Sequence, residues 1–169
     1  NYLSVVPVML QFALACVPDI DSYSFPNLNW MNYGASPISV DLLTRCLEVF
    51  DCELYQGYGQ TEATTALTFL THDDHMRALE SKPELLRSCG RPVFATELRI
   101  VDDQGKTLPT GEIGEILARG PQVMKGYWKR EEATAKTVVD GWLHTGDAGY
   151  LDDEGYLYIK DRVKDLVIS

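Results

Sequence analysis

The sequence has 169 residues, of which 45% are hydrophobic and 24% charged, the composition of a globular protein that can bury a core. Its net charge of −10 argues against a surface for nucleic acid or anionic membranes, but not against a nucleotide, whose phosphates bind backbone N–H groups and metal ions. The apolar run 5–17 contains Pro7 and follows no basic segment, so we expect neither an export signal nor a membrane span. The four cysteines form no CxxC pair, which favours free thiols in a cytoplasmic protein over disulfides.

Hydrophobic patterning before residue 85 alternates between strand-like and helix-like periods. The sequence predicts a buried strand over 28–34, a helix over 36–50 and a second strand over 52–59. Ser36 is the expected N-cap of the helix and Pro37 its first residue. The expected apolar face of this helix comprises Val40, Leu43, Leu47 and Phe50. This strand–helix–strand order is typical of a parallel sheet.

After residue 85 the pattern changes to short strands and turns. Strands are predicted over 97–101, 112–120 and 156–162, and a short one over 149–151. DDQG and DDEG lie between strand candidates, and they lack the alternating ligands of a calcium loop, so we predict hairpin turns there. One helical segment is expected over 130–139.

The stretch HDDH (72–75) places two histidines three residues apart. A helix capped by Asp73 or Asp74 explains this stretch more simply than a metal site does. The sequence has no nucleophile elbow and no GxxxxGK[ST] phosphate loop, so it lacks the local signatures of those two enzyme classes.

The stretch QGYGQTE closes the second predicted strand. Gly57 and Gly59 allow the backbone to approach a ligand closely. Tyr58 offers an aromatic ring, Thr61 a hydroxyl and Glu62 a carboxylate that could serve as an oxygen ligand for Mg²⁺. These groups suit a purine nucleotide, and ligands bind at the carboxyl ends of strands in open α/β sheets. A glycine turn that starts a helix explains the stretch equally well when it is taken alone.

Two further stretches are compatible with the same ligand. Gly34, Ala35 and Ser36 are small, so a planar group could lie against the backbone at the end of the preceding strand, although Gly before an N-cap is also a routine connection. In GWLHTGD (141–147), Gly146 allows a bend and Asp147 could accept hydrogen bonds from both hydroxyls of a ribose. In DRVKD, Arg162 and Lys164 could add cationic contacts. Taken singly, each of these charged residues is better explained as a surface or turn residue.

The order of YGASP, QGYGQTE and the segment from GEIGEILARG to the end of the sequence resembles the adenylate-forming superfamily of acyl-CoA synthetases, luciferases and nonribosomal adenylation domains. The likeness extends from Tyr33 to Ser169 and is strongest to fatty acyl-CoA and 4-coumarate-type ligases. It implies an α/β plus β fold, in which part of an αβ sheet subdomain (1–85) precedes a small distorted β-barrel subdomain (86–163). Residues 164–169 would begin the hinge to a C-terminal domain.

The resemblance also implies roles for individual residues. The adenine and acyl side of the pocket would be lined by small or planar residues, namely Gly34, Ala35, Ser36, Gln56, Gly57 and Tyr58, with Tyr58 stacking on adenine. Thr61 would contact the α-phosphate and Glu62 the Mg²⁺, both in a catalytic role. Asp147 would bind the ribose hydroxyls, with support from Arg162. Lys164 matches the hinge position.

The implied reaction uses ATP, Mg²⁺ and coenzyme A to activate a carboxylic acid as acyl-AMP and transfer it to a thiol. The family's phosphate loop and C-terminal lysine would lie before Asn1 and after Ser169, so we expect an internal fragment that is inactive alone. A medium- to long-chain fatty acid is the favoured substrate; an aryl acid, a carrier-protein acceptor and a non-catalytic nucleotide-binding module are alternatives. The expected walls of the acid pocket are Tyr33, Gly57, Ala63 and Thr64. The sequence does not determine the oligomeric state.

Overall fold

The computed structural model describes residues 1–163, and the predicted hinge residue Lys164 lies outside them. The chain divides into two compact units. The first unit comprises Asn1–Gly57 and Phe69–Gly90, and the second comprises Tyr58–Thr68 and the chain from Arg91 onward. The predicted boundary between two subdomains at residues 85–86 stays a prediction. Among the described residues, no helix is both long and apolar enough to cross a membrane.

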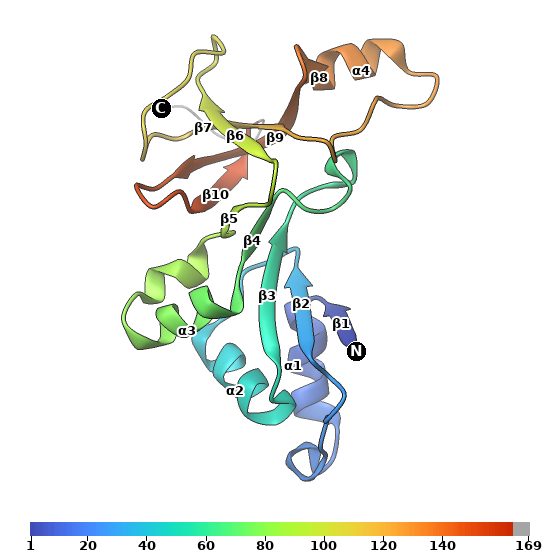
Figure 1. The fold of residues 1–169 in the computed structure, drawn as a ribbon, viewed down its shortest axis with the longest axis vertical. Helices are drawn as coiled ribbons and strands as arrows, with labels where there is room; N and C mark the ends of the chain where they lie inside the picture. The colour runs from blue at the N-terminus through green and yellow to red at the C-terminus, as the bar shows by residue number, and fades with distance from the viewer. Residues whose placement is uncertain (164–169) are drawn as a thin grey trace. The chain divides into compact units, whose positions relative to one another are not determined.

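The first unit contains three strands that pair in parallel, as the alternating pattern predicted (Figure 1). These strands are β1 (Tyr2–Val5), β2 (Trp30–Gly34) and β3 (Glu53–Tyr58), and in the strand order of the sheet β4 (Thr68–Leu70) and β5 (Arg91–Pro92) follow β3. β2 is parallel to both β1 and β3, and Gly34 pairs with Gly57. The helices of this unit are α1 (Pro7–Cys16), α2 (Val40–Phe50), α3 (His72–Glu80) and two 3₁₀ turns, Ile20–Ser22 and Pro83–Arg87.

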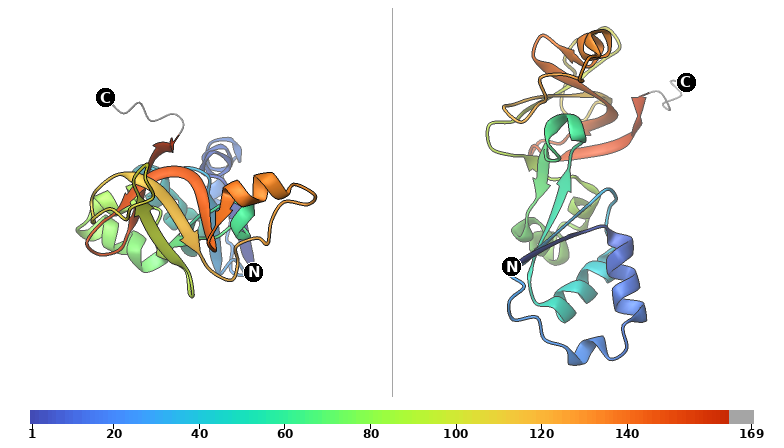
Figure 2. Two further views of the ribbon diagram at one scale, coloured as in Figure 1. Left: turned by 90° about the horizontal axis from the view of Figure 1, so that it is seen from above. Right: turned by 90° about the vertical axis from the view of Figure 1, so that its right-hand side faces the viewer.

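One face of this sheet forms the core of the first unit. Side chains alternate along a strand, and those pointing to this face are buried: Met31, Tyr33, Leu54 and Gln56. Helices α1 and α2 lie on the same side of the sheet (Figure 2). Gly34 and Gly57 therefore lie at the carboxyl ends of two neighbouring strands, whose positions are fixed by the packing of helices against one face.

Helix α2 begins later than the sequence predicted. Ser39, not Ser36, is its N-cap, and the Ser39 hydroxyl accepts a hydrogen bond from the Leu42 backbone N–H at 3.3 Å. Ala35 has a left-handed φ of 69°, so the chain turns there, and the helix begins only at Val40. Leu43 and Phe50 are buried as expected, whereas Val40 is exposed.

Helix α3 is capped by Thr71, and the predicted caps Asp73 and Asp74 are wrong. The Thr71 hydroxyl accepts from the Asp74 N–H at 3.2 Å, and the Asp74 carboxylate accepts from the Thr71 N–H at 2.9 Å. This reciprocal capping box satisfies donors that a helix start otherwise leaves free. Asp74 therefore takes part in the cap from inside the helix.

The second unit contains an antiparallel sheet with the strand order β10-β9-β7-β6, in which β8 also pairs with β9. The strands of this sheet are β6 (Glu97–Val101), β7 (Gly114–Arg119), β8 (Val138–Val139), β9 (Trp142–Leu151) and β10 (Leu157–Arg162), and β5 (Arg91–Pro92) is not one of them. Its helices are α4 (Glu131–Thr137) and the 3₁₀ turn Thr61–Ala63. Over the described residues this sheet has two ends and does not close into a barrel.

The two acidic stretches are hairpin turns, as predicted. The Asp102 carboxylate accepts hydrogen bonds from the backbone N–H groups of Gln104 and Lys106, both at 2.9 Å. The Asp152 carboxylate accepts from those of Glu154 and Tyr156 in the same way, at 3.0 and 2.9 Å. In such an Asx turn, the Asp carboxylate accepts hydrogen bonds from backbone N–H groups of its own loop.

Candidate functional site

The backbone around Asp147 is held inside a strand. Strand β9 passes through Asp147 and continues to Leu151. Gly146 has a φ of 70°, a conformation that glycine adopts without strain, and it redirects the strand at this point. The Thr145 hydroxyl donates to the Ile116 carbonyl at 2.7 Å and accepts from the Asp147 N–H at 3.1 Å. These two hydrogen bonds hold the Asp147 backbone in place.

The Asp147 carboxylate contacts two other residues that the sequence analysis singled out. The Tyr58 hydroxyl donates to one carboxylate oxygen at 2.7 Å, and Arg162 Nε lies 3.0 Å from the other. Arg162 is the last residue of β10 and pairs directly with Asp147 across the hairpin, which explains the ion pair. The Asp147 side chain is 14% exposed and that of Arg162 is 56% exposed. The group is thus an anchored carboxylate with a solvent-facing guanidinium beside it.

The turn that carries Thr61 and Glu62 is anchored by its neighbours. Ala63 and Leu67 are fully buried in a cluster with Ala118 and Leu143, against which Tyr58 also packs. Thr61 is exposed and Glu62 is half-buried. The apolar residues on either side therefore hold the turn, while its two polar side chains remain accessible.

Tyr127 contacts Glu62, and the sequence analysis did not predict this contact. Its hydroxyl donates to one oxygen of the Glu62 carboxylate at 2.6 Å. The hydrogen bond to Glu62 raises the pKa of the Tyr127 phenol above its usual value. Tyr127 lies in the sequence KGYW, 65 positions from Glu62, and no local pattern could have joined the two.

A bound Mg²⁺ would be compatible with this carboxylate only together with other ligands. The described residues contain no group of three or more His, Cys, Asp or Glu side chains that could hold a metal ion. Mg²⁺ is commonly bound by one or two carboxylates together with the phosphates of a substrate. Glu62 fits that arrangement, in which the metal arrives with a nucleotide.

The loop after β2 contributes mainly backbone. A Cβ added to Gly34 would lie 2.8 Å from the carbonyl oxygen of Gly57, so only glycine allows these two strand ends to approach so closely. Ala35 and Ser36 are exposed. Their role in lining a ligand pocket stays a prediction.

Gln56 and Gly57 face opposite sides of the first unit's sheet. The Gln56 side chain is 4% exposed, and its Oε1 lies 3.5 Å from the Tyr33 hydroxyl. A ligand at this strand end would therefore meet the backbone of Gln56 and not its amide. A Cβ on Gly57 would lie 3.1 Å from the Phe69 ring and 3.4 Å from Asn32 Oδ1, which has no hydrogen-bond partner among the described residues.

Tyr33 and His75 form a buried polar pair in the first unit. The Tyr33 hydroxyl lies 2.6 Å from His75 Nε2, and His75 Nδ1 lies 2.6 Å from the Thr71 carbonyl oxygen. A carbonyl only accepts, so Nδ1 carries the proton and Nε2 accepts from Tyr33. Burial lowers the pKa of His75 to about 4 and raises that of Tyr33. The position of Tyr33 in this core argues against its predicted role as a pocket wall.

Trp142 and His144 pack against neighbouring strands just before Asp147. Two guanidinium groups, those of Arg99 and Arg119, lie 4.2 and 4.6 Å from the centre of the Trp142 ring. His144 Nδ1 lies 2.9 Å from the Glu115 carboxylate. Both side chains are therefore engaged by neighbouring strands.

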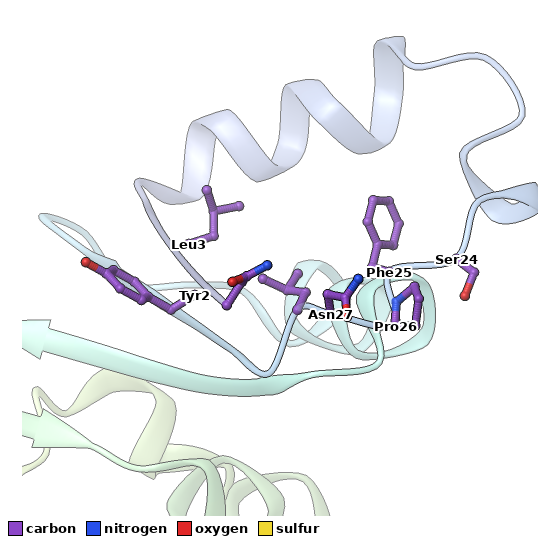
Figure 3. Close-up of a pocket in the computed structure, with 8 residues that line it drawn as sticks. Tyr2, Leu3, Ser24, Phe25, Pro26 and Asn27 are labelled. Atoms are coloured by element: carbon purple, nitrogen blue, oxygen red, sulfur yellow. The ribbon is translucent and has the colours of Figure 1, made fainter.

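A hollow of about 380 Å³ lies at the beginning of the chain, between β1 and the segment before β2 (Figure 3). Leu3 and Phe25 point from its two sides toward α1. Its lining comprises Asn1, Tyr2, Leu3, Ser24, Phe25, Pro26, Asn27 and Leu28. None of these side chains is a carboxylate, imidazole or thiol, so the lining offers no general acid or base of those kinds.

The chain matches the family model described as AMP-binding enzyme over residues 1–128, which is most of its length. This match includes both glycine-containing strand ends and the Thr61–Glu62 turn. The chain belongs to the AMP-binding enzyme family.

This AMP-binding enzyme chain has curated relatives with different acids and acceptors in their names. It is 40% identical over 97% of its length to a fatty acid–[acyl-carrier-protein] ligase of Streptomyces coeruleorubidus, covering 31% of that protein. It is 39% identical over 99% of its length to a 2-succinylbenzoate–CoA ligase of Bacillus cytotoxicus, covering 33% of it. It is 39% identical over 98% of its length to a medium/long-chain-fatty-acid–CoA ligase of Mycobacterium tuberculosis, covering 28% of it. The chain thus spans about a third of the length of these relatives.

Two solved structures share the fold of this AMP-binding enzyme chain. An amide bond synthetase from Marinactinospora thermotolerans matches with a TM-score of 0.85 and 37% identity, over 99% of this chain and 33% of that one. An O-succinylbenzoate coenzyme A synthetase from Bacillus subtilis, in complex with ATP and magnesium ion, matches with a TM-score of 0.81 and 36% identity, over 100% of this chain and 33% of that one. These matches confirm the predicted fold class.

Proposed function

We propose that the parent protein is an ATP-dependent acid–thiol ligase, which activates a carboxylic acid as acyl-AMP and transfers it to coenzyme A. The observation that carries this proposal is the Asp147 carboxylate held between the Tyr58 hydroxyl and Arg162. Asp and Arg side chains suit the hydroxyls and charge of a nucleotide, and the family and the names of the relatives supply the class of reaction.

The described residues would bind and orient ATP. Tyr58 would stack on adenine, and Asp147 would accept hydrogen bonds from the two ribose hydroxyls, with Arg162 beside them. Thr61 would donate a hydrogen bond to the α-phosphate. Glu62 would bind the Mg²⁺ that accompanies the phosphates and offsets their charge. The backbone from Gly34 to Ser36 and at Gln56–Gly57 would line the adenine and acyl side.

Chemistry would occur at the α-phosphorus of ATP. A carboxylate oxygen of the acid forms a bond to this phosphorus. At the same time, the bond between the phosphorus and the bridging oxygen of pyrophosphate breaks. Both reacting partners are anionic, so alignment and charge compensation are the main tasks of the site. In the second step a thiol attacks the acyl carbonyl and AMP leaves.

The acid and the acceptor are the finer parts of the proposal. We assign a medium- to long-chain fatty acid and coenzyme A, which the name of the Mycobacterium tuberculosis relative supports. An aryl acid is the second candidate, because a relative of equal identity is named a 2-succinylbenzoate–CoA ligase. A carrier protein is the second candidate acceptor, because another relative is named for that acceptor. The four free cysteines support a cytoplasmic setting.

Pyrophosphate exchange into ATP by the full-length parent tests the adenylation step directly. We expect exchange that depends on the acid and is strongest with fatty acids of medium to long chain. Comparing CoA with a phosphopantetheinyl carrier protein as acceptor then separates the two thiols. Absence of exchange across fatty and aryl acids would overturn the ligase proposal, and exchange with aryl acids alone would replace the substrate.

A further inference from the structure

Residues 120–128, in the connection between β7 and α4, are hydrogen-bonded to the turn that carries Glu62, within the second unit (Figure 1). The Met124 backbone N–H donates to the Glu62 carbonyl at 2.7 Å. The Thr64 hydroxyl donates to the Gln122 carbonyl at 2.9 Å. With the bond from Tyr127 to the Glu62 carboxylate, three hydrogen bonds connect this loop and the turn.

The loop is itself held at both of its ends. Gln122 Nε2 donates to the Thr96 hydroxyl at 2.5 Å, and the Tyr127 backbone N–H donates to the Thr134 hydroxyl of α4 at 2.9 Å. Gly126 has a φ of 149°, and a Cβ there would lie 2.6 Å from Thr134 Cγ2. Because Gly126 packs closely against α4, the position of the Tyr127 backbone is restrained. The Tyr127 phenol therefore reaches Glu62 from a fixed backbone.

The turn on the other side of this contact is strained. Thr64 and Thr65 have left-handed φ values of 50° and 77°, which cost energy for residues with a Cβ. Strain of this kind persists only where surrounding contacts hold it, and the Gln122 carbonyl supplies one of them. Glu62 is thereby held at a defined position between a buried Ala63 and the loop.

Only one oxygen of the Glu62 carboxylate is engaged among the described residues. Oε1 accepts from Tyr127, whereas no partner of Oε2 is found in residues 1–163. A hydrogen bond to one oxygen restricts rotation of the carboxylate and leaves the other oxygen available as a ligand. In metal sites such hydrogen-bond partners orient the ligating carboxylate.

We propose that Tyr127 is a positioning residue for Glu62, whose hydroxyl orients the carboxylate toward the Mg²⁺ that accompanies ATP. This inference rests on the proposed role of Glu62 in the ligase. Tyr127 itself touches neither substrate nor metal.

The test compares Tyr127→Phe, Glu62→Gln and the double variant in the full-length parent. Two quantities are measured: the Mg²⁺ concentration for half-maximal pyrophosphate exchange, and the Kd of ATP by calorimetry with Mg²⁺ and with EDTA. Tyr150→Phe is the matched control, because it removes a hydroxyl from a ring that stacks on Tyr158 elsewhere in the unit. Melting temperatures check that each variant folds.

We expect Tyr127→Phe to weaken MgATP binding and raise the Mg²⁺ requirement roughly 3- to 10-fold, with ATP binding in EDTA unchanged. Adding this change to Glu62→Gln should have no further effect, since the carboxylate that Tyr127 orients is already gone. A Tyr127→Phe variant that behaves like Tyr150→Phe, binds Mg²⁺ more tightly, or weakens ATP equally in EDTA would overturn the inference while leaving the ligase proposal intact. An unchanged Mg²⁺ requirement in Glu62→Gln would overturn the role of Glu62 itself.

Discussion

Each carboxylate oxygen of Asp147 contacts one protein side chain, Tyr58 or Arg162. Substitutions can therefore measure the contribution of each contact to ATP binding separately. Replacing Asp147 by Ala in the parent should raise the KM for ATP on the order of 100-fold, the effect of losing two charge-assisted hydrogen bonds to ribose. Steady-state exchange kinetics at varied ATP measure this. Asp153→Asn, in the exposed β9–β10 turn, is the control. An equal KM for ATP in both variants would show that Asp147 does not bind the ribose.

Tyr58 has two separable parts, a ring and a hydroxyl. Tyr58→Phe keeps the ring and removes the bond to Asp147, so we expect a rise in the ATP KM of roughly 3- to 10-fold. Tyr58→Ala also removes the surface on which adenine would stack, and base–aromatic stacking adds about 1–3 kcal/mol. The KM for ATP should therefore rise further in Tyr58→Ala. Identical values for the two variants would contradict a stacking role.

At the scale of elements, α3 is tied to β2 through the buried His75–Tyr33 pair. Burial lowers the pKa of His75 to about 4, from 6.5 when unfolded. The unfolded chain therefore binds more protons between these values, so stability is complete above pH 6.5 and is lost as the pH falls toward 4. The loss approaches about 3 kcal/mol at the lower end.

Melting temperatures of the parent between pH 7.5 and 4.5 test this pH dependence. His75→Gln cannot gain the same proton, so its melting temperature should fall less over that range, even though it starts lower. His72→Gln, a half-exposed histidine in the same helix, should retain most of the wild-type slope. Equal slopes for wild type and His75→Gln would show that other groups control the acid sensitivity.

At the scale of the whole chain, the second unit is assembled from two separate segments. Residues 58–68 supply Ala63 and Leu67, both fully buried with Ala118 and Leu143. A fragment that starts at residue 86, the boundary suggested by composition, lacks these side chains. Burying one leucine contributes about 1.5–3 kcal/mol, which is a large part of the stability of a small unit. We expect this fragment not to fold cooperatively.

A second fragment provides the comparison. The Val93 N–H donates to the Leu67 carbonyl at 3.0 Å, so residues 68 and 91 are close enough to be joined by a short Gly–Ser linker in place of 69–90. The fragment 58–68–linker–91–163 should give dispersed amide NMR signals and cooperative thermal unfolding. Cooperative folding of 86–163 alone, or failure of the linked fragment, would contradict the two-segment assembly.

The sequence by itself determined the local features of this protein. Hydrophobic periodicity gave the strand at 97–101 with its observed bounds, and it located β2, β3 and α2 to within a few residues. The family resemblance, confirmed by the family match, rests on contiguous motifs. These features depend on neighbours along the chain, which is why a linear reading reached them. The N-caps were missed because the left-handed turn at Ala35 and the reciprocal bonds of Thr71 are three-dimensional.

Only the tertiary structure decided which side chains meet. Tyr58 and Asp147 are 89 positions apart, and their hydrogen bond follows from the packing of the 58–68 segment against β7 and β9. The same packing brings Tyr127 to Glu62. Gln56 and Gly57 are adjacent in the motif, yet the alternation of a strand sends one side into the core and the other away from it. Motifs identify the residues of a site, whereas strand alternation and long-range burial determine which of their atoms remain available to a ligand.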